Sequence, residues 1–254
     1  MNDQWFEHGI GGKVLLNIQA YSIESARAAT KLLGKSVLIG VMARDYPVLN
    51  DGVAYIDQLH REGINVSVGL GDGSAEQWER ALQLTLATQP VHLNQIFPAA
   101  ALSQYAVKQH GASTLVNAMI KPAGQAGFVL LGTGPLSQNS PTSSAIPVEA
   151  AVAMMKETGI RSVKYFPIEG CKRLDELRAV ARAAARADIA LEPTGGIAPD
   201  NVEEVVRVCL EEGVTRVMPH LYGSLKNPAT NDLDTDKLNQ AVDRITRLFE
   251  RTAQ

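Results

Sequence analysis

The sequence predicts an α/β protein of the (β/α)8 TIM-barrel class. Short apolar segments with strand character alternate with helical patterns along almost the whole chain. Strict alternation predicts parallel pairing, because each crossover between parallel strands needs a helix. The length of 254 residues is close to the roughly 250 typical of such barrels, which favours closure over an open sheet. No repeat or linker divides the chain, so we expect a single domain over residues 1–254.

Eight strands and eight helices account for this alternation. The strands are the short runs rich in β-branched and aliphatic residues at 14–20, 36–43, 64–71, 91–97, 113–120, 162–166, 189–192 and 215–218. The helices are the helical patterns between and after them, at 23–33, 52–62, 76–87, 99–109, 147–158, 174–187, 200–212 and 236–249.

One segment interrupts the alternation. Residues 127–133 (GFVLLGT) have the character of an extra strand directly after the fifth, and a polar stretch rich in turn formers follows at 135–141. We therefore expect an elaborated loop after strand 5, over residues 127–145, built as a hairpin and a lid. Loops at this end of a barrel commonly build the catalytic face, although an interface element without a catalytic part explains the pattern equally well.

Composition excludes several functional classes. Hydrophobic residues make up 45% of the chain, and the net charge of −3 comes from mixed acidic and basic residues. The chain has no basic stripe for nucleic acid, no polybasic run for a membrane surface, no apolar run of about 20 residues and no signal-peptide pattern at its start. Cys171 and Cys209 match no metal spacing, so we expect a reduced, cytoplasmic protein.

Lys164 is the first candidate for chemistry. The segment 162–166 is β-branched and aromatic and stops at Pro167, as a buried strand does where it meets a loop. A buried ammonium group tends to lose its proton, and a neutral amine is a nucleophile toward carbonyl carbon. Because alternate residues of a barrel strand point inward, Ser162 and Phe166 would share the face of Lys164. The sequence leaves the phase open, and a surface lysine on an edge strand is the alternative.

Two glycine-containing loops predict an anion site. The seventh strand runs into Thr194, Gly195 and Gly196 and then into a helix. Glycine lets the backbone approach a ligand closely, and a helix N-terminus attracts an anion. The eighth strand leads into Gly223 and Ser224, which would add a backbone N–H and a hydroxyl. Ordinary turns are the alternative, but barrels commonly hold a phosphate after strands 7 and 8, so the pair favours an anion site.

Charged residues near other strand ends are further candidates. Arg44 and Asp45 follow the second strand, where the arginine suits a carboxylate, although a solvated ion pair explains both residues. Glu192 lies inside the seventh strand, where a carboxylate is costly without a partner. It would be a general base with a raised pKa, or the partner of a buried arginine or lysine. Lys121 ends the fifth strand before a proline, so it competes with Lys164 as imine former, as an anion ligand or as a plain loop lysine.

Several other polar residues lie in or near the apolar strands. Asn17, Asn94, Gln95 and Asn117 either line a site or are hydrogen-bonded core amides. Asp72, His92 and His220 lie near strand ends without the spacing of a metal site.

Two motifs resemble the 2-keto-3-deoxy-6-phosphogluconate aldolases. The run Lys164-Tyr165-Phe166-Pro167 resembles that family's Lys-Phe-Phe-Pro run, and residues 193–197 match its Pro-Thr-Gly-Gly-Ile run on the next strand. Gly223 and Ser224 fall where the family has Gly-Gly-Ser. The close resemblance covers about the last third of the chain, and the greater length is similar to a separate, larger branch of aldolases acting on the same phosphorylated keto acid.

The resemblance implies a class I aldolase that needs neither a cofactor nor a metal. Lys164 would form an imine with the C2 ketone of a phosphorylated keto sugar acid, and the C3–C4 bond would break to release pyruvate and glyceraldehyde 3-phosphate. Thr194 and Arg44 would hold the pyruvate carboxylate. The phosphate would be held by Gly195, Gly196, Gly223 and Ser224.

The general base departs from the family pattern. The family places a glutamate on strand 2, four residues before its arginine, and in this sequence that position is Gly40. Glu192 and Asp45 are the candidates for the base, and a water molecule or a group on another strand is the alternative.

Other functions of the same barrel stay open at this point. A phosphosugar isomerase or epimerase would share the anion site but need no imine, and another pyruvate-dependent aldolase, of the 4-hydroxy-2-oxoglutarate type, would share the imine. A barrel that only binds a sugar phosphate has no positive support, and a metal-dependent aldolase would need a ligand cluster that the spacing does not provide. Barrel aldolases of this kind often assemble, so we expect a homo-oligomer.

Overall fold

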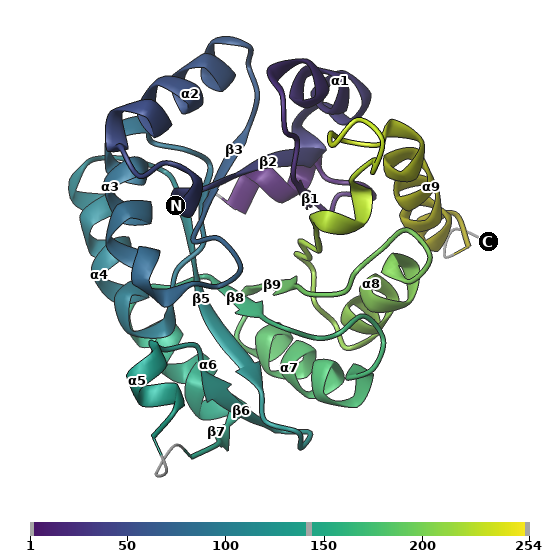
Figure 1. The fold of residues 1–254 in the computed structure, drawn as a ribbon. Coiled ribbons are helices and arrows are strands. Elements are labelled where there is room, and N and C mark those ends of the chain that lie inside the picture. Colours follow the sequence, from purple (N-terminus) through teal and green to yellow (C-terminus); the bar gives the residue numbers. More distant parts are fainter. Residues whose placement is uncertain (1–2, 141–143, 252–254) are drawn as a thin grey trace.

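The computed structural model describes residues 3–140 and 144–251. Residues 141–143 of the predicted loop 127–145, including the end of the polar stretch 135–141, lie outside the described residues. The described chain forms a ring of parallel strands surrounded by helices, which confirms the TIM barrel (Figure 1). The barrel strands are β1 (Leu16–Ile18), β2 (Val37–Met42), β3 (Val66–Gly69), β4 (His92–Leu93), β5 (Leu115–Pro122), β8 (Ser162–Tyr165), β9 (Ala190–Pro193) and β10 (His220–Leu221).

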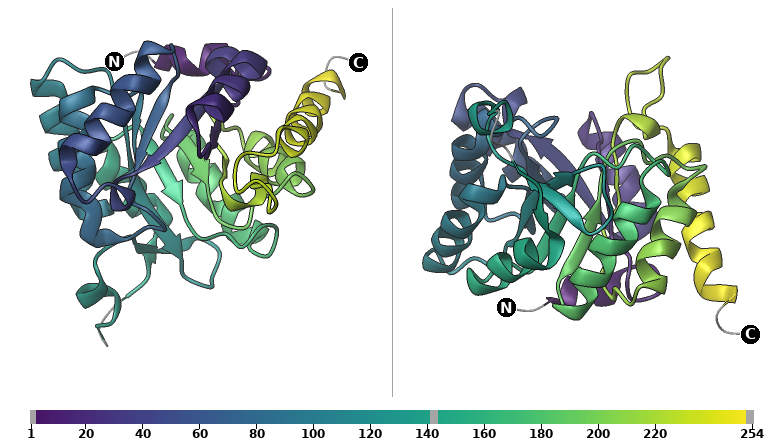
Figure 2. Two further views of the ribbon diagram at one scale, coloured as in Figure 1. Left: turned by 45° about the horizontal axis from the view of Figure 1, so that its top comes forward. Right: turned by 90° about the horizontal axis from the view of Figure 1, so that it is seen from below.

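The eight predicted helices all form. They are α1 (Ile23–Leu33), α2 (Leu49–Arg61), α3 (Trp78–Thr88), α4 (Phe97–Gln109), α6 (Val148–Glu157), α7 (Leu174–Arg186), α8 (Val202–Glu211) and α9 (Thr235–Arg251). Short 3-10 turns occur at η1 (Asp3–His8), η2 (Gly34–Ser36), η3 (Ala43–Asp45), η4 (Ala75–Gln77) and η5 (Gly223–Leu225). Figure 2 shows the helices standing around the strands from two further directions. In the described residues, no helix has the length and apolar character needed to cross a membrane.

Parallel pairing runs around the ring from β10 through β1, β2, β3, β4, β5 and β8 to β9. Between β9 and the last strand the connection consists of isolated parallel bridges, from Leu191 to Val217 and from Thr194 to His220. The amide of Met218 also donates to the carbonyl of Leu191 at 2.9 Å. The ring is therefore closed by single bridges rather than by a continuous ladder.

Two predicted strands differ from the observed ones. The eighth strand, predicted at 215–218, is represented by isolated bridges at Val217 and then by β10 after Pro219. Proline lacks the N–H that an unbroken ladder needs, so it interrupts the pairing between these two parts. The fourth strand, predicted at 91–97, is only β4, and α4 begins at Phe97. Here the amide of Gln95 donates to Asn117 Oδ1, and the amide of Ile96 donates to Gln95 Oε1. Side chains thus take these two ladder bonds, and only a single parallel bridge joins Ile96 to Met119.

The inner and outer faces of the strands carry different residues. Outward-facing Ile39, Val68 and Val163 belong to the main apolar cluster shared with the helices. Inward-facing Leu15, Leu38, Ala190 and Met218 form a separate buried cluster with Phe6, which fills one end of the barrel. Above this apolar floor the inward positions become polar, and that change places the site.

The extra strand after β5 is confirmed. β6 (Phe128–Leu131) pairs antiparallel with β5, and β7 (Ile146–Pro147) pairs antiparallel with β6. The hairpin is tied to the barrel by Glu176 of α7, which accepts hydrogen bonds from the amides of Ala123 and Gly124 at 3.1 and 2.9 Å. The short helix α5 (Pro135–Gln138) follows β6 and lies at the edge of the molecule in Figure 1.

Candidate functional site

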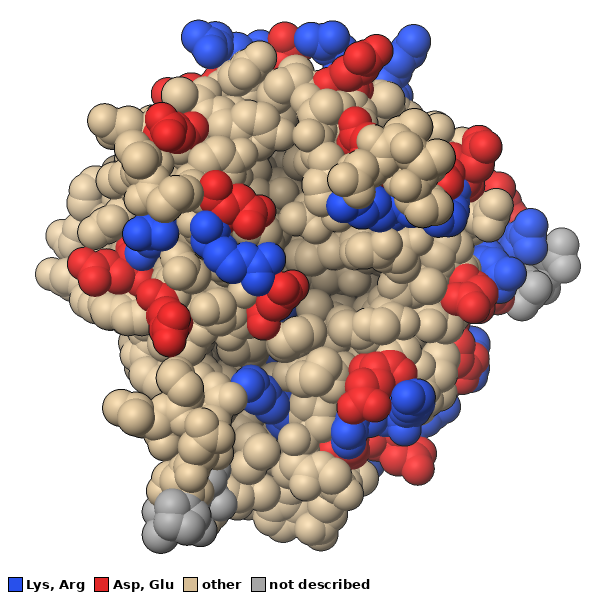
Figure 3. All heavy atoms as spheres, in the orientation of Figure 1, with Lys and Arg blue, Asp and Glu red and all other residues tan. Residues whose placement is uncertain are grey.

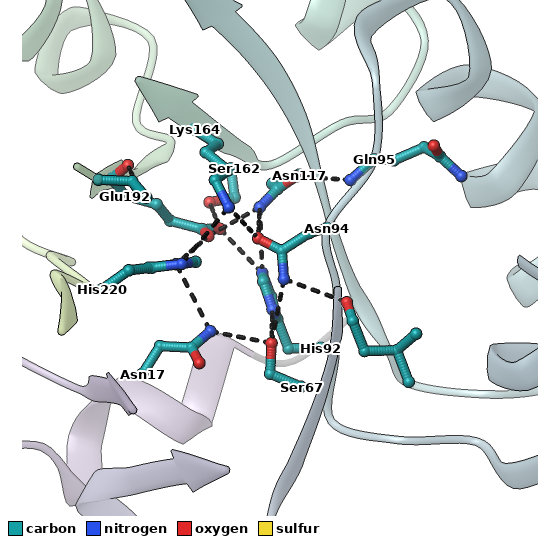
Figure 4. A network of polar contacts seen from close by, with 12 residues as sticks. Asn17, Ser67, His92, Asn94, Gln95, Asn117, Ser162, Lys164, Glu192 and His220 are labelled. Atoms are coloured by element: carbon teal, nitrogen blue, oxygen red, sulfur yellow. Dashed lines mark hydrogen bonds and ion pairs between the residues drawn. The ribbon is translucent and has the colours of Figure 1, made fainter. Parts of the chain in front are cut away.

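Lys164 lies on the inner face of β8 with 8% of its surface exposed. In the sheet it is level with Met119 of β5 and Glu192 of β9. Ser162 and Phe166 share its face, since Ser162 donates to Glu192 and the Phe166 ring lies 5.8 Å from Lys164 Nζ. The amine therefore points into the barrel (Figure 4), which answers the question of phase that the sequence left open.

The burial of Lys164 makes its neutral amine more abundant than in a solvated lysine. Its Nζ donates to Asn94 Oδ1 at 2.9 Å and lies 3.5 Å from His220 Nδ1. Burial lowers the pKa of Lys164 to about 8, although the charge of Glu192 acts in the opposite direction. At this pKa about one amine in ten is neutral at pH 7, against a few in ten thousand for a solvated lysine.

A cavity of about 60 Å³ opens beside Lys164 at the centre of the ring, and Figure 3 shows the hollow in the molecular surface. A water molecule needs roughly 10–15 Å³ on the same measure, so the space holds a small ligand of about four to six heavy atoms. Met42, Gly69, Leu70, Gly71, Asp72, Gly73, Asn94, Gln95, Met119, Lys164, Phe166, Thr194 and Tyr222 line it. Neither β6, α5 nor β7 contributes to this lining, so the described part of the predicted lid does not cover the cavity.

Glu192 lies beneath the cavity as a fully buried carboxylate. Its oxygens accept hydrogen bonds from His92 Nε2 and His220 Nε2, both at 2.9 Å, from Asn117 Nδ2 at 2.7 Å and from the Ser162 hydroxyl. Burial raises the pKa of this carboxyl, but the two histidines outweigh burial and hold it well below its usual range. The expected raised pKa is therefore wrong, and the expected arginine or lysine partner is replaced by two histidines.

The hydrogen bonds assign the protons of both imidazoles. Each ring presents Nε2 to Glu192, and a carboxylate only accepts, so Nε2 carries the hydrogen. In a neutral imidazole the other nitrogen, Nδ1, is an acceptor. For His92 the donor is the Ser67 hydroxyl at 2.8 Å, and for His220 the group facing Nδ1 is the Lys164 amine.

Arg44 and Asp45 lie outside the cavity. Arg44 Nη1 is 2.7 Å from Asp72 Oδ2, and its Nε is 3.7 Å from Asp45 Oδ1. Asp72 lines the cavity, whereas Arg44 and Asp45 do not. Arg44 therefore reaches the rim through Asp72, and the half-exposed Asp45 is not brought to Lys164 as a base.

The glycines after β9 have a structural reason to be glycine. Gly195 and Gly196 both have positive φ. A Cβ at Gly196 would lie 2.6 Å from the amide nitrogen of Gly170. A Cβ at Gly195 would lie 3.0 Å from Pro167. The close approach is thus to the loop after β8, which joins the two motifs in space. Thr194, just before them, lines the cavity.

The loop after β10 supplies an unused hydroxyl. Gly223 and Ser224 form η5 with Leu225. The Ser224 Oγ is buried and has no hydrogen-bond partner among the residues that the structure describes. A buried hydroxyl without a partner costs free energy unless a ligand completes it, which agrees with an anion site here.

The side chain of Lys121 binds α5 rather than the cavity. Its Nζ donates to Gln138 Oε1 of α5 at 2.6 Å, and partial burial lowers the pKa of the amine. Lys121 does not line the cavity. Between the two competing lysines, the geometry favours Lys164.

Tyr222 occupies the place where the resemblance would put a glutamate. A Cβ at Gly40 would lie 3.1 Å from Tyr222 Oη and 2.9 Å from Met42 Cε. Tyr222 lines the cavity, and its hydroxyl donates to Asn17 Oδ1 at 3.1 Å. Burial raises the pKa of the phenol, so it stays protonated.

Sequence reasoning did not assign the polar layer beneath the cavity. Its members are Asn17, Ser67, His92, Asn94, Asn117, Ser162, Glu192 and His220. Gln95 also lines the cavity, but its side-chain amide donates to Trp78 O and Ser103 Oγ rather than to this layer. The available signal was the spacing of polar residues by two within apolar strands, as at 92 and 94 or 162 and 164. Among the described residues, no group of three or more His, Cys, Asp or Glu side chains is arranged to hold a metal ion.

Comparison with solved structures supports the fold alone. The chain is similar to 3-hexulose-6-phosphate synthase from Salmonella typhimurium, with a TM-score of 0.58 and 12% identity over 92% of this chain and 99% of that one. It is also similar to phosphoribosyl anthranilate isomerase from Thermus thermophilus, with a TM-score of 0.55 and 14% identity over the same shares of the two chains.

Sequence comparison identifies a family. A 2-dehydro-3-deoxy-phosphogluconate aldolase from Salmonella typhimurium (strain 14028s / SGSC 2262) is 36% identical over 240 residues, which cover 94% of each chain. The family model described as KDGP aldolase matches residues 10–229. The match includes the β8 and β9 motifs and both lysines. The chain belongs to the KDGP aldolase family of enzymes.

Proposed function

We propose that the protein is a class I aldolase that cleaves a 2-dehydro-3-deoxy-6-phosphogluconate-type substrate to pyruvate and glyceraldehyde 3-phosphate. The observation that carries this proposal is the buried amine of Lys164, with a pKa lowered to about 8, beside a cavity sized for a small ligand. The family relationship supports aldol cleavage, and the lysine supports an imine as the means.

The cleavage follows from the electronics of an imine. The neutral amine of Lys164 adds to the C2 ketone, and loss of water leaves a protonated imine. The C3–C4 bonding electrons move toward the positive nitrogen as a base removes the C4 hydroxyl proton, which releases the aldehyde and leaves an enamine. Protonation of the enamine at C3 and hydrolysis of the imine then release pyruvate and restore Lys164.

The remaining site residues have proposed roles at the two ends of the substrate. Thr194 at the cavity wall would bind the carboxylate of the pyruvate portion. Arg44 would join it by exchanging Asp72 for the substrate carboxylate, because a two-point contact with an arginine suits that group. The phosphate would be held by Gly195, Gly196, Gly223 and Ser224, for which the unpartnered Ser224 hydroxyl is the support.

Reductive trapping tests the proposal. Borohydride added with pyruvate should attach a three-carbon unit to the peptide that contains Lys164, and Lys164→Ala should abolish both the adduct and cleavage while the protein stays folded. Lys121→Ala is the matched control, because Lys121 is the competing strand-end lysine outside the cavity, and it should leave the adduct in place. An adduct on Lys121, or full cleavage by Lys164→Ala, would overturn the assignment of the imine.

A further inference from the structure

The Lys164 nitrogen has one position left for its lone pair. A neutral amine has two N–H bonds, and two acceptors face them, Asn94 Oδ1 at 2.9 Å and His220 Nδ1 at 3.5 Å. The remaining tetrahedral direction is available on the cavity side, because Lys164 also lines the cavity. The contacts that hold the amine thus orient the nucleophile toward the space that a ketone would enter.

His220 is the titratable group in direct contact with that nitrogen. It is buried with 3% of its surface exposed, and its Nε2 lies 2.9 Å from Glu192 Oε2. The other rings near it are those of His92 at 6.3 Å and Tyr222 at 5.5 Å between centroids. Burial and then the charge of Lys164 lower the pKa of His220 to about 3, so at neutral pH the ring is an uncharged acceptor at Nδ1.

We propose that His220 accepts a proton from the Lys164 nitrogen during imine formation, and that Glu192 is the positioning residue that holds the imidazole for this task. The proposal rests on the imine at Lys164 and names the proton acceptor that the imine requires. The three side chains divide the work as a nucleophile, a base and an orienting carboxylate do in other sites. Here the nucleophile is an amine, and the three groups come from β8, β10 and β9.

Imine formation moves protons between the Lys164 nitrogen, His220 and the C2 oxygen. The lone pair of the neutral amine forms the N–C2 bond, and the carbonyl π electrons move to oxygen, leaving a positive nitrogen and an alkoxide. His220 Nδ1 takes one proton from that nitrogen. Glu192 stabilises the resulting imidazolium. The imidazolium then gives its proton to the C2 oxygen, which is bonded to the same carbon as the Lys164 nitrogen. A second proton, taken from a solvent water that remains as hydroxide, lets this oxygen leave as water, and the nitrogen keeps its last hydrogen as the protonated imine.

Other groups near the nitrogen do not suit this step. His92 bonds the opposite oxygen of Glu192 and does not contact Lys164 in the described structure. Tyr222 stays protonated because burial raises the pKa of its phenol, and its hydroxyl donates to Asn17. Asn94 accepts a hydrogen bond from the amine, but an amide oxygen does not take up the proton.

The test is the rate at which cyanoborohydride traps pyruvate on Lys164. His220→Gln keeps a polar side chain of similar length but offers no nitrogen that accepts a proton, so trapping should slow by about 10²-fold or more. His110→Gln makes the same change at an exposed residue near the end of α4 and should trap at the wild-type rate. Circular dichroism and thermal melting show whether each variant is folded.

Imine formation at Lys164 and proton transfer to His220 fail in different measurements. Trapping by His220→Gln at the wild-type rate and with the wild-type pH profile would overturn the role of His220 while leaving the imine intact. Failure of the wild-type protein to trap pyruvate on Lys164 would overturn both.

A measurement on the wild-type protein covers the case in which His220→Gln does not fold. Nitrogen-15 NMR of the histidines at pH 7 should show His220 with hydrogen on Nε2 and none on Nδ1. After reduction of the pyruvate adduct the bond to Nζ changes, so the Nδ1 resonance should shift. A hydrogen on Nδ1 in the free enzyme would overturn the proposal, because that nitrogen would then have no lone pair to accept the proton.

Discussion

At the scale of single residues, the charge of one amine sets when the protein can react. Lys164 must be neutral to add to a ketone, and its pKa is about 8 because it is buried. The rate of pyruvate trapping should therefore rise about tenfold per pH unit below pH 8 and level off above it. Trapping measured from pH 5 to pH 10 checks the profile. A midpoint near the ordinary lysine value would mean that the amine is solvated.

Glu192→Gln should change that profile in two separate ways. The charge of Glu192 raises the pKa of Lys164, so removing it should move the midpoint to lower pH. The glutamine would also present an N–H to one of the two histidines that now donate to the carboxylate, so His220 loses its fixed orientation and the plateau rate should fall. The midpoint and the plateau are read from the same trapping series. An unchanged midpoint would show that this carboxylate carries no charge in the native protein.

At the scale of elements, the two-residue repeat of the strands decides which side chains meet. In β8, Ser162 and Lys164 face inward, while Val163 and Tyr165 are buried among the outer apolar residues. The strand itself was predictable from its β-branched and aromatic residues. Its phase was not predictable, because the apolar face packs against the helices and the polar face lies inside the barrel, so both faces are buried. Burial on both faces removes the usual contrast between core and solvent that reveals phase.

The predicted ends of two strands were wrong for reasons that composition does not show. The fourth strand stops early because the side chains of Asn117 and Gln95 take over the backbone amides of Gln95 and Ile96. The eighth continues beyond its apolar run because Pro219 only interrupts the ladder. Both depend on contacts between residues distant in sequence or on a single missing donor, so a window of residues does not reveal them.

The loops after β8 and β9 pack against each other at Gly196. Gly196 and Gly111 share a φ of +69°, but a Cβ at Gly196 would meet backbone atoms at 2.6 and 2.9 Å. A Cβ at Gly111 would meet no atom of the described chain within 4 Å. Gly111→Ala should cost about 1 kcal/mol from the left-handed backbone alone. Gly196→Ala should cost about 1–3 kcal/mol more from the clash with the loop after β8. Urea unfolding of the two variants measures the difference, and equal losses would show that the two loops are not packed together.

At the scale of the whole molecule, the site exists only because the ring is closed. Lys164, Glu192 and His220 come from three strands, and His92 of β4 and Asn94, which directly follows β4, complete their contacts. The barrel and the two motifs of β8 and β9 were predictable from alternation and local pattern. The polar layer was not, since its members are separated by up to 203 residues and each one alone resembles a satisfied core residue. The single domain, the homo-oligomer and the cytoplasmic location stay predictions.

The buried polar layer should also make the whole fold sensitive to acid. The pKa of His220 is about 3 in the folded protein and near 6.5 when unfolded, so below pH 6.5 the unfolded chain binds a proton that the folded one does not. Stability is then lost as pH falls, by up to about 1.4 kcal/mol per pH unit for this group. The lowered pKa of Glu192 acts with the same sign below pH 4.5, because its stabilisation is present above that value and is lost as the carboxylate is protonated. His220→Gln removes the contribution of His220, so the free energy of unfolding of this variant should decline less between pH 6.5 and pH 4.5 than that of the wild type. The pKa of His60 is also lowered by burial, but His60 contributes equally to the variant and the wild type. Urea titrations at pH 7.0, 6.0 and 5.0 compare the two slopes, and parallel slopes would mean that His220 is solvated or charged in the native barrel.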